Sequence, residues 1–293
     1  MSLTSKREIK NLFEKHQIGP SKRLGQNFLV DKGAVKKIIE AADLGPEDVI
    51  LEVGPGLGVL TQELAIRVKK VIGIEKDPKM CEILKELLEC WNVRNVEIIE
   101  GDILKLNTKY KIPNTKYKVV ANLPFYLAAP VIRQFLEVEN PPREMVLVVQ
   151  KEVGQRICAK PPGSKRINPL LRPSLPLGQM SILAVSVQVY SEPKIISYIS
   201  KKSFWPQPKV DSAIIKITPI AKPNLAIDLF FKVVKAGFSQ PRKQLINNLS
   251  KKLDLGKEKI QNWLLKNNIQ PTQRAETLEV QDWINLTKTI KIN

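Results

Sequence analysis

The stretch LEVGPGLGVLT, residues 51–61, is an apolar run that leads into three closely spaced glycines. Glycine allows a tight turn and a close approach of the backbone to a ligand, because it has no Cβ. The G-x-G-x-x-G fingerprint of dinucleotide-binding folds is not formed, since it needs a glycine at Val59 and the third glycine here is Gly58. We interpret this turn as a ligand-binding loop between a strand and a helix. The simpler alternative is a strand-to-helix turn that binds nothing.

Apolar runs that alternate with helical patterns surround this loop. Residues 32–42 place apolar residues at helical spacing, and strand-like runs follow at 68–75, 96–103, 116–123 and 143–150. Strands that alternate with helices predict a parallel, doubly wound α/β sheet with helices on both faces. Two more strand-like runs, ILAVSVQV (182–189) and VDSAIIKI (210–217), are expected to complete this domain near residue 220.

The two ends of the chain differ from the central part. Residues 1–33 form a basic arm in which Gly19, Pro20 and Gly25 interrupt any long helix. From residue 225 onward the apolar residues recur three or four apart, which predicts helices. We therefore expect an arm at 1–33, a central domain at 34–220 and a helical domain at 221–293.

The composition indicates a globular protein with a strongly basic charge. Of 293 residues, 43% are hydrophobic and 26% charged, and 47 basic against 29 acidic residues give a net charge of +18. No apolar run approaches the roughly 20 residues of a membrane helix, so we expect no membrane span. Such a charge attracts phosphate polyanions and makes nucleic acid the expected partner, although solubility alone is another explanation. Three cysteines without a C-x-x-C pair fit neither a disulfide framework nor a zinc site, so we expect a cytoplasmic protein without a metal.

Acidic residues follow two of the strand-like runs. Glu75 ends the run at 68–75, and Asp102 follows the core of the run at 96–103. The carboxyl ends of parallel strands meet at one edge of a sheet, so both side chains are expected near the glycine loop. A carboxylate at Glu75 can accept the hydroxyls of an unphosphorylated ribose, and Asp102 can accept the amino group of adenine. Either acid alone is more commonly a solvated surface residue, but ligand groups at three strand ends favour a binding site.

The tetrapeptide Asn122-Leu123-Pro124-Phe125 follows the run at 116–123 and resembles the N/D-P-P-Y/F motif of methyltransferases that act on exocyclic amines. The amide oxygen of Asn122 and a main-chain carbonyl, for which we take that of Leu123, can accept both hydrogens of an adenine amino group. The nitrogen lone pair then points at the methyl donor, and alignment rather than a strong base supplies the rate. Phe125 can stack on the base. The alternative has Asn122 capping a helix and Phe125 in the core.

These motifs, with others, produce a resemblance that covers nearly the whole chain. The sequence resembles the KsgA-type small-subunit rRNA adenine N6,N6-dimethyltransferases in the stretches at 22–31, 51–61, 74–77, 101–104, 121–132, 150–157, 204–214, 236–249 and 271–280. The resemblance implies a Rossmann-like class I methyltransferase sheet, mostly parallel with its last strand antiparallel, and a small all-helical C-terminal domain. It also implies methyl transfer from S-adenosyl-L-methionine to two adjacent adenosines near the 3′ end of small-subunit rRNA.

The resemblance further implies roles for individual residues. The cofactor would contact Asn27, Leu29, Gly54, Gly56, Glu75, Asp102 and Asn122, with Gly54 under its methionine part and the arm as a lid. The catalytic residues would be Asn122, Leu123, Pro124, Phe125 and Phe204. Phe204 is expected to close on the target base opposite Phe125, and the alternative for Phe204 is a buried core aromatic.

The helices of residues 221–293 carry basic residues that can neutralise phosphates and position a folded RNA, and Arg242 and Lys243 are the expected phosphate contacts. The alternative is that these residues only form the solvated face of the helices. We expect a monomer that acts on a pre-ribosomal small-subunit particle. A large-subunit rRNA adenine methyltransferase of the macrolide-resistance type and a non-catalytic ribosome-assembly factor are the alternatives. The chain departs from the family in having Phe125 for the usual Tyr and Tyr126 for a small polar residue, and the sequence leaves the role of Tyr126 open. It also has a long segment rich in Pro and Arg at 165–180, which we interpret as a surface insertion, with an added rRNA contact as the alternative.

Overall fold

The computed structural model describes residues 3–105, 116–162 and 179–290. Most of the Pro- and Arg-rich segment 165–180 lies outside these described residues, so its predicted role as an insertion or an RNA contact is not addressed. The chain divides into two compact units, Met1–Gly154 with Pro193–Pro219, and Gln155–Glu192 with Ile220–Asn293. Each unit is described by itself below.

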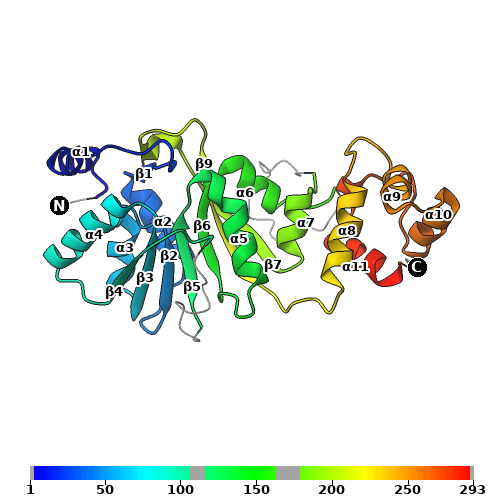
Figure 1. Ribbon diagram of the computed structural model, residues 1–293, viewed down its shortest axis with the longest axis horizontal. Helices are drawn as coiled ribbons and strands as arrows, with labels where there is room; N and C mark the ends of the chain where they lie inside the picture. Colours follow the sequence, from blue (N-terminus) through cyan, green and yellow to red (C-terminus); the bar gives the residue numbers. More distant parts are fainter. Residues whose placement is uncertain (1–2, 106–115, 163–178, 291–293) are drawn as a thin grey trace. The chain divides into compact units, whose positions relative to one another are not determined.

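A seven-stranded sheet forms the centre of the first unit (Figure 1). Its strands lie in the order β4 (Val96–Glu100), β3 (Lys70–Glu75), β2 (Val49–Val53), β5 (Lys118–Asn122), β6 (Met145–Gln150), β9 (Ser212–Pro219) and β7 (Ser191–Ile199). The pairs from β4 to β6 are parallel, and β9 runs antiparallel to β6. The predicted class, a mostly parallel doubly wound sheet, is confirmed. The chain winds outward from β2 to β4 and then returns to β5, so β2 and β5 flank the point where an open sheet binds its ligand.

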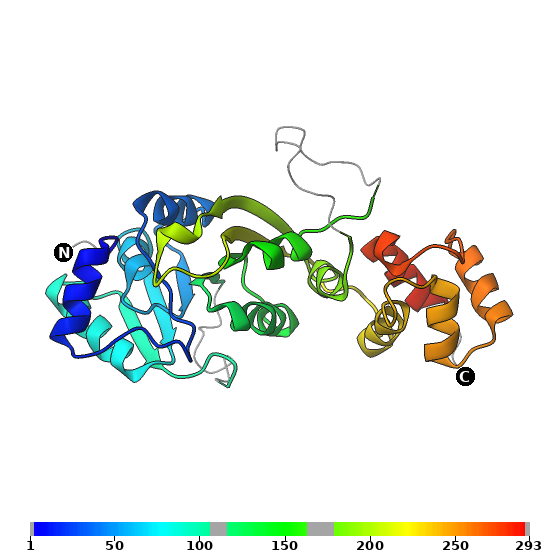
Figure 2. The same cartoon turned by 90° about the horizontal axis from the view of Figure 1, so that it is seen from above.

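Helices cover both faces of this sheet. Side chains of α2 (Lys32–Ala41) and α3 (Val59–Ala65) form one buried cluster with Val120, Val146 and Val148 of the strands. Figure 2 shows α5 (Ala128–Glu137) on the opposite face from α2. Successive strand residues point to opposite faces, which explains why most residues of β5 and β6 are apolar and buried.

The N-terminal arm folds against the first unit. It contains α1 (Lys6–Lys15), which the sequence analysis did not predict, and the two-residue strand β1 (Phe28–Leu29). The apolar side of α1 packs with Phe28 and with residues of α4 (Pro78–Cys90) in one cluster. Strand β1 pairs antiparallel with β8 (Phe204–Trp205), so the arm is joined by backbone hydrogen bonds to a segment about 175 residues away in the sequence.

The strand predicted for the run ILAVSVQV at 182–189 is wrong, because this run forms helix α7 (Ile182–Gln188). Ser181 caps its first turn by accepting a hydrogen bond from the N–H of Ala184 at 3.2 Å. The polar side chain of Gln188 can be buried because its amide donates hydrogen bonds to the carbonyls of Ile157 and Ala159, both at 2.8 Å. The strand is instead the next segment, β7, whose side chains alternate between buried and exposed. Its Pro193 is tolerated because β7 lies at the edge of the sheet.

The second unit is helical in its described part. The predicted C-terminal helices are confirmed as α8 (Ile227–Gly237), α9 (Leu245–Leu253), α10 (Lys257–Lys266) and α11 (Val280–Thr289). Trp283 of α11 is fully buried against Gly237, where a Cβ would come within 2.4 Å of the indole ring. None of the helices described here or in the first unit is long and apolar enough to cross a membrane.

Candidate active site

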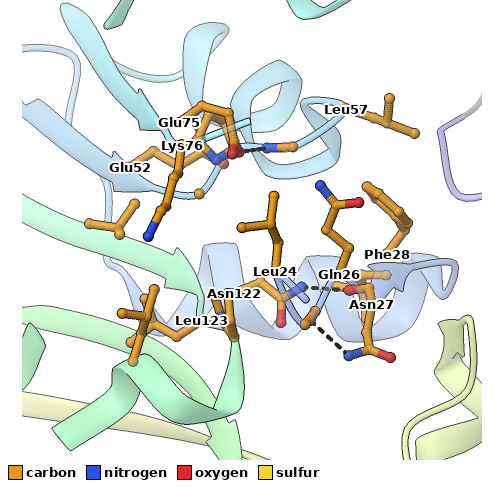
Figure 3. A pocket seen from close by; sticks show the side chains of 18 of the residues that line it. Leu24, Gln26, Asn27, Phe28, Glu52, Leu57, Glu75, Lys76, Asn122 and Leu123 are labelled. Carbon is orange, nitrogen blue, oxygen red and sulfur yellow. Dashed lines mark hydrogen bonds between the residues drawn. The ribbon is translucent and has the colours of Figure 1, made fainter. Parts of the chain in front are cut away.

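One pocket in the first unit lies at the carboxyl ends of β2, β3 and β5, and residues of the N-terminal arm form part of its wall (Figure 3). Every predicted cofactor-binding and catalytic residue lines it: Asn27, Leu29, Gly54, Gly56, Glu75, Asp102, Asn122, Leu123, Pro124, Phe125 and Phe204. The two predicted RNA-binding residues, Arg242 and Lys243, do not line it, because they are exposed between α8 and α9 of the second unit.

The glycine loop after β2 leaves space on the pocket side. Gly54 has a backbone φ of +70°, which residues other than glycine rarely adopt. A Cβ built at Gly54 would meet nothing within 4 Å. The backbone at Gly54 therefore borders open space in the pocket. The N–H of Gly56 already has a partner within the protein, because it donates to Oε2 of Glu75 at 2.9 Å. That bond fixes the loop to the end of β3.

Glu75 is buried, with 8% of its surface exposed. Its two carboxylate oxygens accept backbone hydrogen bonds, Oε2 from Gly56 and Oε1 from Asp77, at 2.9 and 2.8 Å. Burial raises the pKa of Glu75, and the backbone donors oppose that rise. Each carboxylate oxygen has two lone pairs, so each keeps acceptor capacity beyond the bond it already makes.

Asp102 is paired with a lysine that the sequence analysis did not identify. The ammonium of Lys76 lies 2.8 Å from Oδ2 of Asp102, and Oδ1 accepts the N–H of Leu104 at 3.1 Å. The hydrogen bond from Lys76 lowers the pKa of Asp102, so this carboxyl group is ionised at neutral pH. Lys76 is the residue after Glu75 and also lines the pocket. Its position after the strand was visible in the sequence, but its partner was not.

Asn122 ends β5 and has an oriented side-chain amide. Its Nδ2 donates to the carbonyl oxygen of Asn27 at 3.1 Å (Figure 3). A carbonyl only accepts, so this bond identifies the nitrogen. Oδ1 is then the acceptor of the amide, and no described residue donates to it. The next residue is anchored too, because Leu123 is buried and its N–H donates to the carbonyl of Val148 at 3.2 Å. In the described residues, no backbone N–H donates to the carbonyl of Leu123.

Two aromatic residues lie on the pocket wall in different settings. Phe125 is partly buried at the start of the short 3₁₀ helix η2 (Phe125–Leu127), just after Pro124. Phe204 is 5% exposed, pairs through its backbone with Leu29, and belongs to the same apolar cluster as Leu29. Phe204 is thus a core aromatic as well as a pocket residue. Tyr126, whose role the sequence left open, is 52% exposed and also borders the pocket.

A known protein family matches almost the whole chain, including the strands and the glycine loop that form this pocket. The family described as ribosomal RNA adenine dimethylase matches residues 20–291. The chain belongs to the ribosomal RNA adenine dimethylase family. The predicted family and enzyme class are confirmed, and RNA is the class of substrate on which this family acts.

Relatives of known name support the family across the full length. The chain is 40% identical to the ribosomal RNA small subunit methyltransferase A of Dehalococcoides mccartyi, over 95% of this chain and 91% of that protein. It is 37% identical to the protein of the same name from Geobacillus kaustophilus, over 96% and 94%. A solved dimethyladenosine transferase from Plasmodium falciparum is 26% identical with a TM-score of 0.70, over 88% of this chain and 95% of that one.

The fold alone is shared with a second solved structure. The 23S rRNA methyltransferase ErmE has a TM-score of 0.68 at 24% identity, over 89% of this chain and 98% of that one. Its likeness confirms the class I methyltransferase architecture of the adenine dimethylase fold. It gives no preference for a large-subunit substrate, which was the alternative left open by the sequence.

A buried acid of the pocket was also missed. Glu52, at the end of β2, is 1% exposed, and its Oε2 accepts the hydroxyl of Thr61 at 2.7 Å. Burial raises the pKa of Glu52 to about 8, with a further rise from the nearby charge of Glu75. Its setting inside an otherwise apolar strand was the signal that could have identified it.

The arm contributes more to the pocket than the sequence suggested. Leu3 and Ile9 line it although both are buried, and Ile9 belongs to the unpredicted helix α1. Ile9, Leu12 and Phe13 are spaced three and four residues apart, so this helical pattern was present in the sequence. Gln26 adds a tether, since its Nε2 donates to Asp77 Oδ2 at 2.7 Å.

Proposed function

We propose that this protein transfers methyl groups from S-adenosyl-L-methionine to N6 of two adjacent adenosines near the 3′ end of small-subunit rRNA, which gives dimethyladenosines. One observation carries the proposal. The Asn122 amide is oriented by the Asn27 carbonyl, so that its oxygen is free to accept in the same pocket that Gly54, Glu75 and Asp102 line.

The pocket residues fit the proposed cofactor. Gly54 borders open space that a Cβ would fill, which suits the methionine part of the cofactor. Glu75 has spare acceptor capacity for the two ribose hydroxyls, and the ionised Asp102 suits the amino group of adenine. When bound, S-adenosyl-L-methionine supplies a methyl group on a positively charged sulfur.

In this proposal the chain aligns the target nitrogen. Oδ1 of Asn122 and the carbonyl of Leu123 accept the two hydrogens of the adenine amino group, which directs the nitrogen lone pair out of the ring plane. As the nitrogen forms its bond to the methyl carbon, the bond from that carbon to sulfur breaks and its electron pair stays on sulfur. The nitrogen then releases one proton to these acceptors or to water. No strong base is needed, because alignment and the polar acceptors supply the rate.

We propose that the two pocket aromatics hold the extruded base. Phe125 is partly exposed and can stack on it, a contact worth about 1 to 3 kcal/mol. Phe204 is buried beside Leu29, so we propose that it forms a fixed apolar wall for the base. Pro124 holds the backbone extended just before η2 and so fixes the position of Phe125, the first residue of that helix.

We propose that the second unit positions the RNA. Arg242 and Lys243 are exposed and follow α8, where they can neutralise phosphates without reading sequence. We also propose, as the sequence predicts, an arm at 1–33, a catalytic domain at 34–220 and an RNA-binding domain at 221–293. A monomer that acts on a pre-ribosomal small-subunit particle in the cytoplasm completes this proposal.

Analysis of modified nucleosides tests the proposed function. Purified protein is incubated with methyl-labelled S-adenosyl-L-methionine and with either undermethylated small ribosomal subunits or large subunits. The rRNAs are then digested and their nucleosides measured by mass spectrometry. We expect labelled N6,N6-dimethyladenosine in small-subunit rRNA only. Label in large-subunit rRNA, or binding of the subunit without any label, would contradict the proposal.

A further inference from the structure

The side chain of Asp31 joins two segments that are far apart in the sequence. Its Oδ1 accepts the N–H of Ala34 at 3.0 Å and so caps the first turn of α2. Its Oδ2 accepts the hydroxyl of Ser203 at 2.6 Å, across 172 residues. Ser203 is buried, with 9% of its surface exposed, and directly precedes Phe204. The same carboxylate therefore fixes a helix start and the loop that carries a pocket aromatic.

Backbone pairing makes this junction continuous with β1. The N–H of Val30 donates to the carbonyl of Ser203 at 2.8 Å. Beyond it, Leu29 faces Phe204 and Phe28 faces Trp205 in the β1–β8 pair. A two-residue strand pair has few hydrogen bonds of its own, so its register depends on the groups at its ends. The bond between Asp31 and Ser203 is at one of those ends.

The other end of β1 meets Asn122. The carbonyl that receives Nδ2 of Asn122 is that of Asn27, the residue immediately before β1. The side-chain amide of Asn27 donates to the carbonyl of Gly25 at 3.0 Å, and this bond holds the turn before β1. A shift of β1 along β8 would move the Asn27 carbonyl and release the Asn122 amide. The orientation of that amide thus depends on contacts made beyond the pocket.

We propose that Asp31 and Ser203 are a positioning pair that sets the direction of the Asn122 amide oxygen through β1. The meaning of this pair for catalysis rests on the proposed methyl transfer, whereas its effect on the Asn122 amide does not. A hydrogen bond to a carboxylate is stronger and shorter than one between neutral groups, which suits a contact that fixes a short strand. The hydrogen bonds from Ser203 and Ala34 also lower the pKa of Asp31, so the carboxylate is ionised at neutral pH.

A pair of serine variants from one loop separates positioning from general stability. Ser203→Ala removes the hydroxyl that donates to Asp31 and leaves the backbone bond to Val30 in place. Ser200→Ala is the matched control, because the Ser200 hydroxyl accepts the N–H of Lys202 at 3.3 Å within the same loop and has no other partner in the part of the chain that the structure describes. Asp31→Asn keeps an oxygen for the helix cap while it removes the charge that attracts Ser203.

Nuclear magnetic resonance of asparagine-labelled full-length protein reads the amide directly. The Asn122 side-chain signal is identified by its loss in Asn122→Ala. We expect Ser203→Ala to move this signal toward the position of a free amide, and Asp31→Asn to move it in the same direction by less. Ser200→Ala should leave it in place. An unmoved signal in Ser203→Ala, or an equal movement in Ser200→Ala, would overturn the inference.

Methylation kinetics of the same proteins add the catalytic test. Ser203→Ala should lower kcat by about tenfold, with less than about a twofold change in the KM for the RNA substrate. The double variant with Asp31→Asn should be no slower than Ser203→Ala alone, since both remove one contact. Additive losses would overturn the pairing. If the wild-type protein makes no dimethyladenosine but the Asn122 signal still follows Ser203, the proposed function fails while the positioning pair stands.

Discussion

Replacement of Asn122 by alanine should separate catalysis from stability. The side chain makes one hydrogen bond within the described protein, to Asn27 at 3.1 Å, so its loss should cost about 1 kcal/mol of folding free energy. Its oxygen is proposed to align the reacting nitrogen, and loss of one such group in other enzymes costs about 100- to 1,000-fold in rate, or about 3 to 4 kcal/mol. The effect on the rate should therefore far exceed the effect on folding.

Single-turnover transfer of a labelled methyl group to undermethylated small subunits measures that rate, and filter binding measures affinity for the subunit. Asn95→Ala is the matched control. Asn95 lies outside the pocket, and its Nδ2 donates to the carbonyls of Ala65 and Val68 at 2.8 and 2.9 Å. It should lose about 2 kcal/mol of stability with an unchanged rate. A rate for Asn122→Ala within about threefold of wild type, or an equal loss of RNA affinity, would refute the reasoning.

Three further outcomes are expected. Glu75→Gln should weaken binding of S-adenosylhomocysteine about tenfold by calorimetry, because it replaces one acceptor oxygen by a donor; unchanged affinity would place the ribose elsewhere. Burial raises the pKa of Glu52 to about 8, above its unfolded value, so its contribution to stability is full at acid pH and is lost as pH rises through 8. In urea unfolding, the free energy of unfolding of Glu52→Gln should therefore rise relative to that of the wild type by roughly 1.4 kcal/mol per pH unit between pH 5 and 8. Free energies of unfolding that change in parallel with pH in the two proteins would contradict this. Neutralising Arg242 and Lys243 together should reduce the salt dependence of RNA binding by about one unit of slope per lost phosphate contact, and an unchanged slope would move the RNA surface elsewhere.

Local signals were enough to predict the parallel sheet and part of the pocket, including Glu75 and Asn122. The central parallel strands β2, β3 and β6 are short, mostly apolar runs, and such runs keep their conformation because both faces of the sheet are covered. Glu75 and Asn122, which we propose as ligand groups, are the last residues of β3 and β5. Their meeting at one edge follows from the parallel direction of the strands, so it was predictable without coordinates.

The errors came where local pattern and tertiary context differ. The run at 182–189 is rich in β-branched residues, but a serine cap and a buried Gln188 make it helical. The true strand β7 contains Pro193, which argues against a central strand and is tolerated only at an edge. Helix α1 lies in a basic arm whose glycines and proline argue against a long helix, so its apolar side was not recognised.

Contacts between distant segments could not be predicted from the sequence. The ion pair of Lys76 with Asp102 depends on the side-by-side pairing of β3 and β4 and on the lysine rotamer. The bond of Asp31 with Ser203 joins residues whose approach only the folded chain defines. These contacts orient the groups that the motifs supply, so motif reading identifies the chemistry and the structure identifies its supports.

A crystal structure of the protein with S-adenosylhomocysteine and adenosine tests the central claim most directly. The decisive quantity is the distance from Oδ1 of Asn122 to N6 of the adenosine. We expect a hydrogen bond of about 2.7 to 3.2 Å, with the cofactor's ribose at Glu75 and its adenine at Asp102. An Asn122 oxygen turned away from N6, or a cofactor bound outside the pocket beside Gly54, would contradict it.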